Sequence, residues 1–247
     1  MSTYTHLELT HNKKSASTIL PIIINLFNPK SVIDVGCGTG SFLSVLSDLG
    51  LKDIKGVEGD WLDRSKLYVD SSLIDTVDLQ KLFSFDRKFD LAICLEVAEH
   101  LAESTADDFV HSLTKLSGVI LFSAAIPGQG GQNHLNEKWV DYWQNKFKRQ
   151  GYSFYDIMRL KFWNNDDVEF WYKQNMFIII DDKVDNFGLA KVESINTFIH
   201  PELFTLIVNN RNDLYEKYIN LAWGKEKVGM YFKLFCKSIL KKMGLTK

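Results

Sequence analysis

Apolar residues follow two alternating patterns between residues 18 and 180. Short β-rich runs, such as Ser31 to Val35, alternate with segments whose apolar residues recur at helical spacing, such as Ser41 to Leu49. Strands that alternate with helices form βαβ units, so this order predicts a buried, largely parallel sheet covered by helices. The expected strands are 31–35, 54–58, 73–77, 89–95, 118–123, 152–158 and 176–180, and the expected helices include 41–49, 102–116 and 137–150.

The segment before the first strand has the composition of a secretory signal peptide. Lys13 and Lys14 are followed by an apolar run from Ile19 to Phe27. No small-residue cleavage site follows, and a strand pattern begins almost at once, so we predict a core helix with Pro21 near its first turn. No apolar run approaches the roughly 18 residues that a membrane-spanning helix needs.

Composition and charge narrow the class of protein. The chain has 247 residues, of which 45% are hydrophobic, and its 29 basic residues nearly balance 31 acidic ones. Proteins that bind nucleic acid are usually strongly basic, so we expect no nucleic-acid partner. The three cysteines (Cys37, Cys94 and Cys236) are far apart, which fits a reduced, cytoplasmic protein. No spacing of His, Cys, Asp or Glu suggests a metal site, and none is expected.

The strongest chemical signal is a glycine-rich turn between the first strand and the next helix. Glycines stand at Gly36, Gly38 and Gly40, and an acid, Asp34, precedes them. Glycines let the backbone turn sharply and approach a ligand, and the following helix directs its N–H groups at that ligand. A dinucleotide-binding fingerprint would place its third glycine where Ser41 stands, so the spacing disfavours a dehydrogenase.

This turn resembles the cofactor loop D-x-G-x-G-x-G of the class I S-adenosylmethionine-dependent methyltransferases. The resemblance spans roughly residues 18–180 and implies a doubly wound, Rossmann-like α/β fold whose mixed seven-stranded sheet is flanked by helices. It implies S-adenosylmethionine as the cofactor, whose cationic amino end suits the acid at Asp34. It assigns the cofactor to Asp34, Gly36, Cys37, Gly38, Gly40, Glu58, Gly59, Asp78, Leu79, Leu95 and Glu96.

The resemblance also implies where parts of the cofactor bind. Glu58 ends the second expected strand and would accept hydrogen bonds from the ribose hydroxyls. Asp78 and Leu79 follow the third strand, where the family often places an acid or amide near the adenine amino group; Asp75 is an alternative. The segment from Phe89 to Leu101 looks like the family's fourth-strand motif, with a trailing Glu-His-hydrophobe.

A long loop is expected at 124–136. The segment from Gly128 to Trp139, followed by Tyr142 and Trp143, is similar to that of a bacterial subgroup linked to surface-polysaccharide biosynthesis, which carries G-G-x-x-H-x-N-E-x-W before a Y-W pair. The resemblance implies a sugar or an activated sugar precursor as acceptor. His134 is the candidate general base for an acceptor hydroxyl, and His100 is the alternative. Glu137 is expected in the first turn of the next helix, although it could instead orient His134.

Four of the six tryptophans lie between residues 139 and 171. Large rings with a polar atom suit an acceptor pocket, including the apolar face of a sugar. The alternative is a core layer between the last helix and the sheet, which we expect for Trp143 and Trp171 but leave open for Trp139 and Trp163.

Residues 1–180 are expected to form the methyltransferase domain, and 181–247 a C-terminal helical extension packed on it. The last 24 residues hold seven lysines and one glutamate, with apolar residues at helical spacing. They predict either a helix packed on the domain with a solvated lysine face, or a basic amphipathic helix that contacts a membrane surface or a partner weakly. The oligomeric state is not predictable.

The predicted function is methyl transfer from S-adenosylmethionine to a small or glycan-linked acceptor, at a sugar hydroxyl or on an activated surface-polysaccharide precursor. An RNA or protein methyltransferase is an alternative, but it would show a large basic face near the loop, which residues 124–150 lack. A cofactor-binding or membrane-docked protein without catalysis is a second alternative. The intact glycine loop and two candidate bases argue against it.

Overall fold

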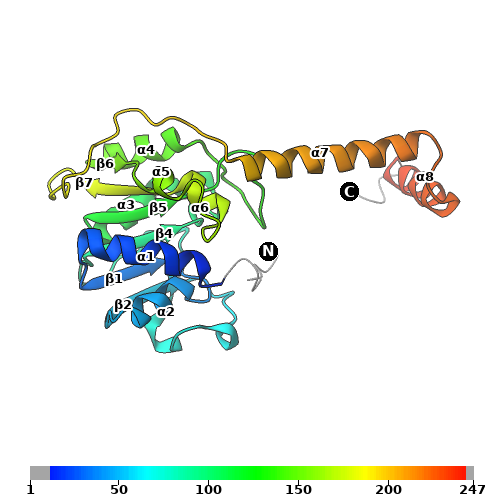
Figure 1. Ribbon diagram of the computed structural model, residues 1–247. Helices are drawn as coiled ribbons and strands as arrows, with labels where there is room; N and C mark the ends of the chain where they lie inside the picture. Colours follow the sequence, from blue (N-terminus) through cyan, green and yellow to red (C-terminus); the bar gives the residue numbers. More distant parts are fainter. Residues whose placement is uncertain (1–11, 243–247) are drawn as a thin grey trace. The chain divides into compact units, whose positions relative to one another are not determined.

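The computed structural model describes residues 12–242, which fall into two compact units, one ending at His200 and the other beginning at Pro201 (Figure 1). The sequence predicts that the extension begins directly after the last strand, at residue 181. Residues 182–200 instead belong to the first unit. Val192 N donates to Phe154 O at 2.9 Å, and His200 N donates to Gln174 Oε1 at 2.7 Å, so backbone hydrogen bonds hold this segment on the first unit.

A seven-stranded mixed sheet forms the centre of the first unit, and this confirms the predicted fold class. The strands lie in the order β3-β2-β1-β4-β5-β7-β6. Neighbours from β3 to β5 are parallel, while β7 runs antiparallel to both β5 and β6. The bounds are β1 Ser31–Val35, β2 Asp53–Glu58, β3 Ile74–Thr76, β4 Leu91–Leu95, β5 Val119–Ser123, β6 Tyr152–Tyr155 and β7 Phe177–Asp181.

The strand order fixes where a ligand can bind. The chain runs outward from β1 through β2 to β3 and then returns to the other side of β1 to form β4. Open α/β sheets bind ligands beside the carboxyl ends of the strands at such a reversal of strand order. The segments that follow β1, β2, β4 and β5 therefore share one edge of the sheet.

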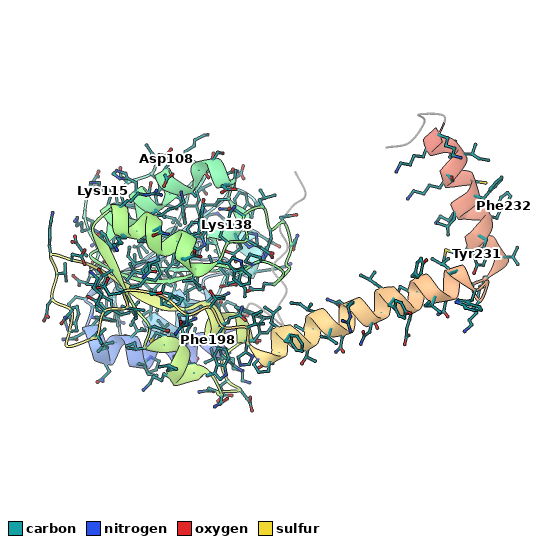
Figure 2. The ribbon with its side chains drawn as sticks, turned by 90° about the horizontal axis from the view of Figure 1, so that it is seen from above. Asp108, Lys115, Lys138, Phe198, Tyr231 and Phe232 are labelled. Carbon is teal, nitrogen blue, oxygen red and sulfur yellow. The ribbon has the colours of Figure 1, made fainter. Side chains whose placement is uncertain are left out.

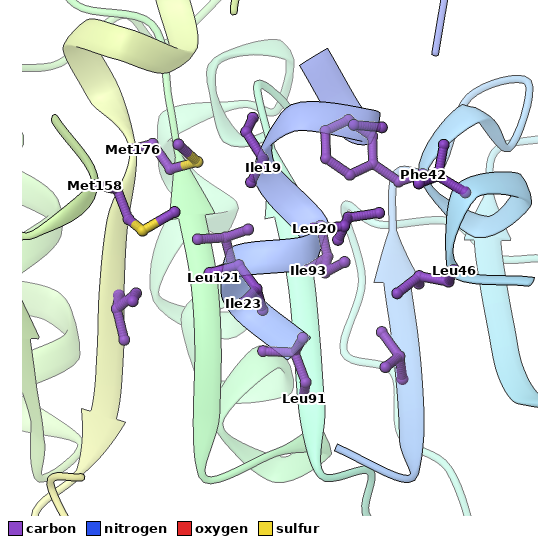
Figure 3. Packing of buried hydrophobic residues seen from close by; sticks show 14 of the residues in the cluster. Ile19, Leu20, Ile23, Phe42, Leu46, Leu91, Ile93, Leu121, Met158 and Met176 are labelled. Atoms are coloured by element: carbon purple, nitrogen blue, oxygen red, sulfur yellow. The ribbon is translucent and has the colours of Figure 1, made fainter. Parts of the chain in front are cut away.

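Aliphatic side chains bury one face of the sheet. The helices α1 (Lys14–Phe27) and α2 (Ser41–Asp48) cover it. Ile19, Leu20 and Ile23 of α1 belong to one buried cluster with Leu91 of β4 and Leu121 of β5 (Figure 3). Each fully buried side chain of this kind contributes roughly 1.5–3 kcal/mol.

Aromatic side chains bury part of the opposite face, beneath α3 (Ala106–Leu116) and α4 (Val140–Arg149). The ring of Phe122 on β5 lies 5.6 Å from Trp143 and 5.2 Å from Phe147, measured between ring centroids. The two helical layers thereby hold the strand ends in fixed positions.

Shorter elements lie between the strands and the long helices. They are α5 Met158–Phe162, α6 Phe170–Asn175, and the 3₁₀ turns η1 Arg64–Lys66, η2 Ser71–Leu73, η3 Ala98–His100 and η4 Glu103–Thr105.

The predicted elements recur with shifted ends. Pro21 lies in the middle of α1, not near its first turn. Its ring is exposed and lies on the other side of the helix from the buried residues Ile19, Leu20 and Ile23. The strand expected at 152–158 ends at Tyr155, and Met158 begins a helix. Helix α4 begins at Val140, three residues later than expected, because the carboxylate of Glu137 is used to hold the loop before it.

The second unit contains two helices, α7 (Pro201–Ala222) and α8 (Val228–Lys242). The predicted helical extension is confirmed, although the sequence analysis does not delimit α7. An apolar stripe on α8 is exposed: Val228 84%, Phe232 67%, Phe235 62% and Ile239 42%. Figure 2 labels Phe232 on this helix. Among residues 12–242, no helix is long and apolar enough to cross a membrane.

Candidate active site

A cleft of about 810 Å³ opens at the carboxyl ends of the strands. This volume lies within the usual range of roughly 300–1,000 Å³ for small-molecule sites. Following the strand order, the cleft has two halves. The cofactor half is lined by residues at the ends of β1 and β2 and in the segments after β1 and β3, including Asp34, Glu58, Gly38 and Leu79. The acceptor half is lined by Glu96, Glu99, His100, Gln129 and His134, which follow β4 and β5.

The glycine turn is shaped for close approach of a ligand. Gly36 and Gly38 have φ angles of +74° and +54°, which side chains rarely tolerate. A Cβ on Gly36 would lie 2.4 Å from Cγ2 of Val97, so no side chain fits there. The N–H groups of Gly36 and Cys37 both donate to Val57 O, which ties the turn to β2. Burial raises the pKa of the Cys37 thiol, so this side chain packs as a neutral group.

Glu58 joins the turn to β2 through its carboxylate. Its Oε2 accepts from Gly38 N and its Oε1 from Gly59 N, both at 2.8 Å. Burial raises its pKa against these two hydrogen bonds. A carboxylate has about four lone-pair positions, so both oxygens can still accept hydrogen bonds from a ribose diol.

Asp34 supplies a second acid on the cofactor side of the cleft. Burial, and then the nearby Glu58, raise the pKa of this carboxyl to about 8. An ammonium group beside it would favour the ionised form. A cation bound on this side of the cleft would therefore stabilise the Asp34 carboxylate.

The residues after β3 divide between the cleft and the surface. Leu79 is buried and lines the cleft together with Trp61 and Gln80. Asp78 is exposed, pairs with Lys81 at 3.0 Å and does not line the cleft. Gly40 and Gly59 also lie outside the cleft lining: Gly40 caps α2 at φ +79°, and Gly59 donates to Glu58. The cofactor assignments at these three positions, like those at the positions that line the cleft, remain predictions.

A network of amides holds Glu96 at the end of β4. Gln129 Nε2 donates to Glu96 Oε2 at 2.7 Å, and Asn175 Nδ2 donates to Glu96 Oε1 at 3.3 Å and to Gln129 Oε1 at 2.8 Å. Glu96 itself has φ +55°, an unusual conformation for this residue type. Burial raises its pKa to about 7 against these hydrogen bonds. The network links β4, the long loop and α6 into one wall of the acceptor half.

Backbone hydrogen bonds bring the long loop onto the turn after β4. The carbonyl oxygen of Glu99 accepts from Leu135 N at 2.8 Å and from Asn136 N at 2.9 Å. This contact places the ring of His134 against that of His100, with centroids 4.8 Å apart. Both candidate bases therefore meet in the acceptor half, although 34 residues separate them in the chain.

Glu137 orients His134, and it does so from the loop and not from the helix. Its Oε1 lies 2.8 Å from His134 Nδ1, and its carboxylate also accepts from Gly128 N and Gly130 N. Burial opposes ionisation of Glu137, but these hydrogen bonds outweigh it and lower its pKa. The ionised carboxylate accepts a hydrogen bond from Nδ1–H, and in this tautomer Nε2 carries the lone pair.

The tryptophans separate into core and cleft residues. Trp143 is only 2% exposed and packs in the core, as expected. Trp171 was expected in the core as well, but it is half-buried and lines the cleft beside Tyr172. Trp139 is 40% exposed, and Trp163 packs against His200 at 4.7 Å. One of the four therefore contributes to the cleft.

Several residues in or behind the cleft are absent from the predicted site. Gln129 lines the cleft, and Asn175 of α6 holds Glu96 and Gln129 from behind it; only the tertiary fold joins these residues to Glu96. Glu99 stands three residues after Glu96, and this repeat of acids within the fourth-strand motif could have signalled it. The structure also brings Glu99, His100 and His134 into one cluster, which spacing along the chain does not reveal.

The cofactor half fits S-adenosylmethionine. The turn at Gly36 and Gly38 offers backbone with no side chain, Glu58 can accept from the ribose, and Asp34 suits the cationic amino group. Leu79 and Trp61 line the cleft and would offer an apolar surface to the adenine ring. When bound, S-adenosylmethionine supplies an electrophilic methyl group on a positive sulfonium.

Comparisons with known proteins agree with this fit. A family model described as a methyltransferase domain matches residues 8–166. Among curated proteins no sequence matches significantly. Solved structures with the same fold include the sugar N-methyltransferase KedS8 from Streptoalloteichus sp ATCC 53650, at 14% identity and a TM-score of 0.54, covering 73% of this chain and 96% of that one.

Two further structures bind the cofactor or its product. CalS10, an amino pentose methyltransferase from Micromonospora echinaspora with bound S-adenosylmethionine, has 16% identity and a TM-score of 0.53, covering 73% of this chain and 99% of that one. Magnesium protoporphyrin IX methyltransferase from Synechocystis PCC 6803, with bound S-adenosylhomocysteine, has 18% identity and a TM-score of 0.50. The match covers 69% of this chain and 83% of that one. At these identities the likeness concerns the fold. The family match covers most of the chain, which therefore belongs to the methyltransferase domain family as an S-adenosylmethionine-dependent enzyme.

Proposed function

We propose that the enzyme methylates a hydroxyl group of a small acceptor, either a sugar or an activated surface-polysaccharide precursor. The observation that carries this proposal is the polar acceptor half, where His100, His134 and Gln129 line the cleft beyond the glycine turn. Two of the similar structures, KedS8 and CalS10, are described as sugar methyltransferases, which supports an acceptor of this class. A cytoplasmic location belongs to the same proposal, because activated sugars are made there.

The protein's own task is to align the acceptor oxygen with the methyl group and to remove its proton. Alignment of reacting groups is worth several kcal/mol in such displacements, about 7–11 kcal/mol at most. Asp34, Glu58 and the glycine turn would fix the cofactor from one side. In the metal-free protein, His134 Nε2 would take the acceptor proton while Glu137 holds Nδ1. His100 is the alternative group for that proton.

An RNA or protein acceptor is less consistent with the charges around the loop. Lys138 pairs with Glu103 at 2.7 Å, and Lys146 pairs with Asp107 at 2.8 Å. These lysines are therefore partly neutralised by acids of α3 and η4. A phosphate backbone is bound chiefly by lysine and arginine side chains that are free to neutralise it.

The test is transfer of labelled methyl groups to a panel of acceptors. The full chain is incubated with S-adenosylmethionine labelled in the methyl group and with nucleotide sugars, reducing sugars, short RNA and an unfolded protein. Label is expected in a sugar or nucleotide sugar, in a base-stable ether. Preferential labelling of RNA or protein would overturn the acceptor class, while S-adenosylhomocysteine formation would still report the enzyme's activity.

The α8 helix supports a second, separate proposal, which is contact with an anionic membrane surface. Its exposed apolar stripe, described above, lies opposite Lys233, Lys237 and Lys241 on the helix. Helices of this pattern lie in the headgroup region of anionic bilayers. Sedimentation with phosphatidylserine vesicles should recover the chain, and Phe232→Ser with Phe235→Ser should reduce this recovery several-fold. Equal recovery with neutral phosphatidylcholine vesicles, or by the double variant, would refute it.

A further inference from the structure

Three side chains in the acceptor half have the composition and spacing of a metal site. Glu99, His100 and His134 each offer one ligand atom, and these atoms all lie within 4.8 Å of one another. Two of the three side chains come from η3, and the third comes from the loop after β5 that hydrogen bonds pin onto it. An ion at their centre would border the cleft, since all three residues line it.

Glu99 is a buried acid that the rest of the protein does not neutralise. Its residue is 0% exposed, and neither carboxylate oxygen has a hydrogen-bond partner among the described residues. Glu99 forms no ion pair with lysine or arginine in residues 12–242. A fully buried carboxylate without a hydrogen-bond partner is costly, and a bound cation would compensate its charge.

His134 is already held in the orientation that metal ligation needs. Ligating histidines commonly donate their second ring N–H to a carboxylate, which fixes the tautomer and leaves the other nitrogen for the ion. Glu137 provides such a carboxylate at Nδ1, and its own charge is secured by two backbone N–H groups. Gly131 lets the backbone of the loop pack directly against the ring of His134, because a Cβ on residue 131 would lie 2.1 Å from His134 Nε2.

We propose that Glu99, His100 and His134 bind a divalent transition-metal ion, with Nε2 of His134 and a carboxylate oxygen of Glu99 as ligands. Two imidazoles and one carboxylate suit first-row transition metals such as Mn²⁺, whereas Mg²⁺ and Ca²⁺ prefer oxygen ligands alone. Three protein ligands leave coordination positions open toward the cleft. Those positions would take the acceptor's oxygen atoms.

This inference rests on the proposed function and changes how the acceptor loses its proton. An acceptor hydroxyl bound to the ion loses its proton to solvent more readily, because the ion stabilises the alkoxide. The alkoxide oxygen then bonds to the methyl carbon as the carbon–sulfur bond breaks, and that electron pair remains on sulfur. In this arrangement His134 is a ligand and not the base.

The test measures Mn²⁺ binding to the full chain after dialysis against EDTA. Free Mn²⁺ gives a six-line electron paramagnetic resonance spectrum that weakens on binding, so titration yields the stoichiometry and affinity. We expect one Mn²⁺ per chain, and at least tenfold weaker binding by Glu99→Gln and by His134→Gln. Mg²⁺ in equal concentration should not displace it.

His111→Gln is the matched control, because His111 lies on α3 near Gln150 and outside the cleft. It should bind Mn²⁺ like the wild type. S-adenosylhomocysteine binding by each variant shows whether the cleft has folded. No Mn²⁺ binding by the wild type, or equal binding by the folded variants, would overturn the metal site.

Failure of the metal site and failure of the proposed function give different results. A chain that methylates sugars at full rate in EDTA would retain the proposed function and refute the role of the ion in the loss of the acceptor's proton. A chain that binds Mn²⁺ through these residues but methylates only RNA or protein would retain the metal site and refute the sugar acceptor. Mg²⁺ that displaces Mn²⁺ at equal concentration would refute the choice of a transition metal.

Discussion

Gly38→Val is expected to abolish binding of S-adenosylhomocysteine. Gly38 has φ +54° and lines the cleft, and its N–H donates to Glu58 at 2.8 Å. A β-branched residue in this conformation is strained by roughly 1–2 kcal/mol, and its methyl groups would enter the space where a ligand meets the backbone. Isothermal titration calorimetry should detect no binding by the variant at ligand concentrations that saturate the wild type.

The matched control for Gly38→Val is Gly50→Val. Gly50 also has a positive φ, of +94°, but it is exposed after α2 and no atom lies within 4 Å of its Cβ position. This substitution introduces similar backbone strain far from the cleft, so it should lower the melting temperature and leave binding intact. Normal binding by a folded Gly38→Val chain would remove the glycine turn from the cofactor site.

The sheet was predictable because its signals are local. The run from Val119 to Phe122 is apolar throughout, as buried parallel strands require, and it ends at a polar residue, Ser123. The glycine turn was predictable for the same reason, since Gly36 and Gly38 lie only two positions apart in the sequence. A strand, a glycine turn and a helix that follow one another within a short stretch of sequence are therefore enough to predict the fold class and the cofactor half of the cleft.

The acceptor half was only partly predictable, because its contacts join distant segments. Asn175 contacts Glu96 and Gln129 only after α6 folds onto the strand ends, and no periodicity in the sequence predicts these contacts. Glu137 has an acid's usual place near a helix start, yet it satisfies Gly128 N and Gly130 N in the loop instead. Tertiary hydrogen bonds here override the local preference for a helical first turn.

The two halves of the cleft differ in what holds them in shape. The cofactor half depends on backbone geometry, in the φ angles of Gly36 and Gly38 and the N–H groups tied to β2 and Glu58. The acceptor half depends on side chains whose positions are fixed by other side chains. Substitutions in the acceptor half should therefore change the chemical step with less effect on cofactor affinity.

His134→Ala is accordingly expected to lower turnover by about 10²-fold or more and to leave S-adenosylhomocysteine affinity near that of the wild type. The side chain lines the acceptor half and lies against His100, while the residues assigned to the cofactor are untouched. Initial rates at saturating S-adenosylmethionine, measured with the sugar acceptor identified by the labelling assay, give this comparison. His111→Ala should keep full turnover.

Added metal separates the two roles that His134 could have. If His134 is a ligand, EDTA should inactivate the wild type, and excess Mn²⁺ should restore part of the activity of His134→Ala, because Glu99 and His100 remain to bind the ion more weakly. If His134 is the base, EDTA should leave the wild type unchanged and Mn²⁺ should not rescue the variant. Glu137→Gln, which keeps the imidazole but weakens its anchor at Nδ1, should lose less turnover than His134→Ala in either case. Unchanged turnover of His134→Ala would exclude both roles and move the proton transfer to His100.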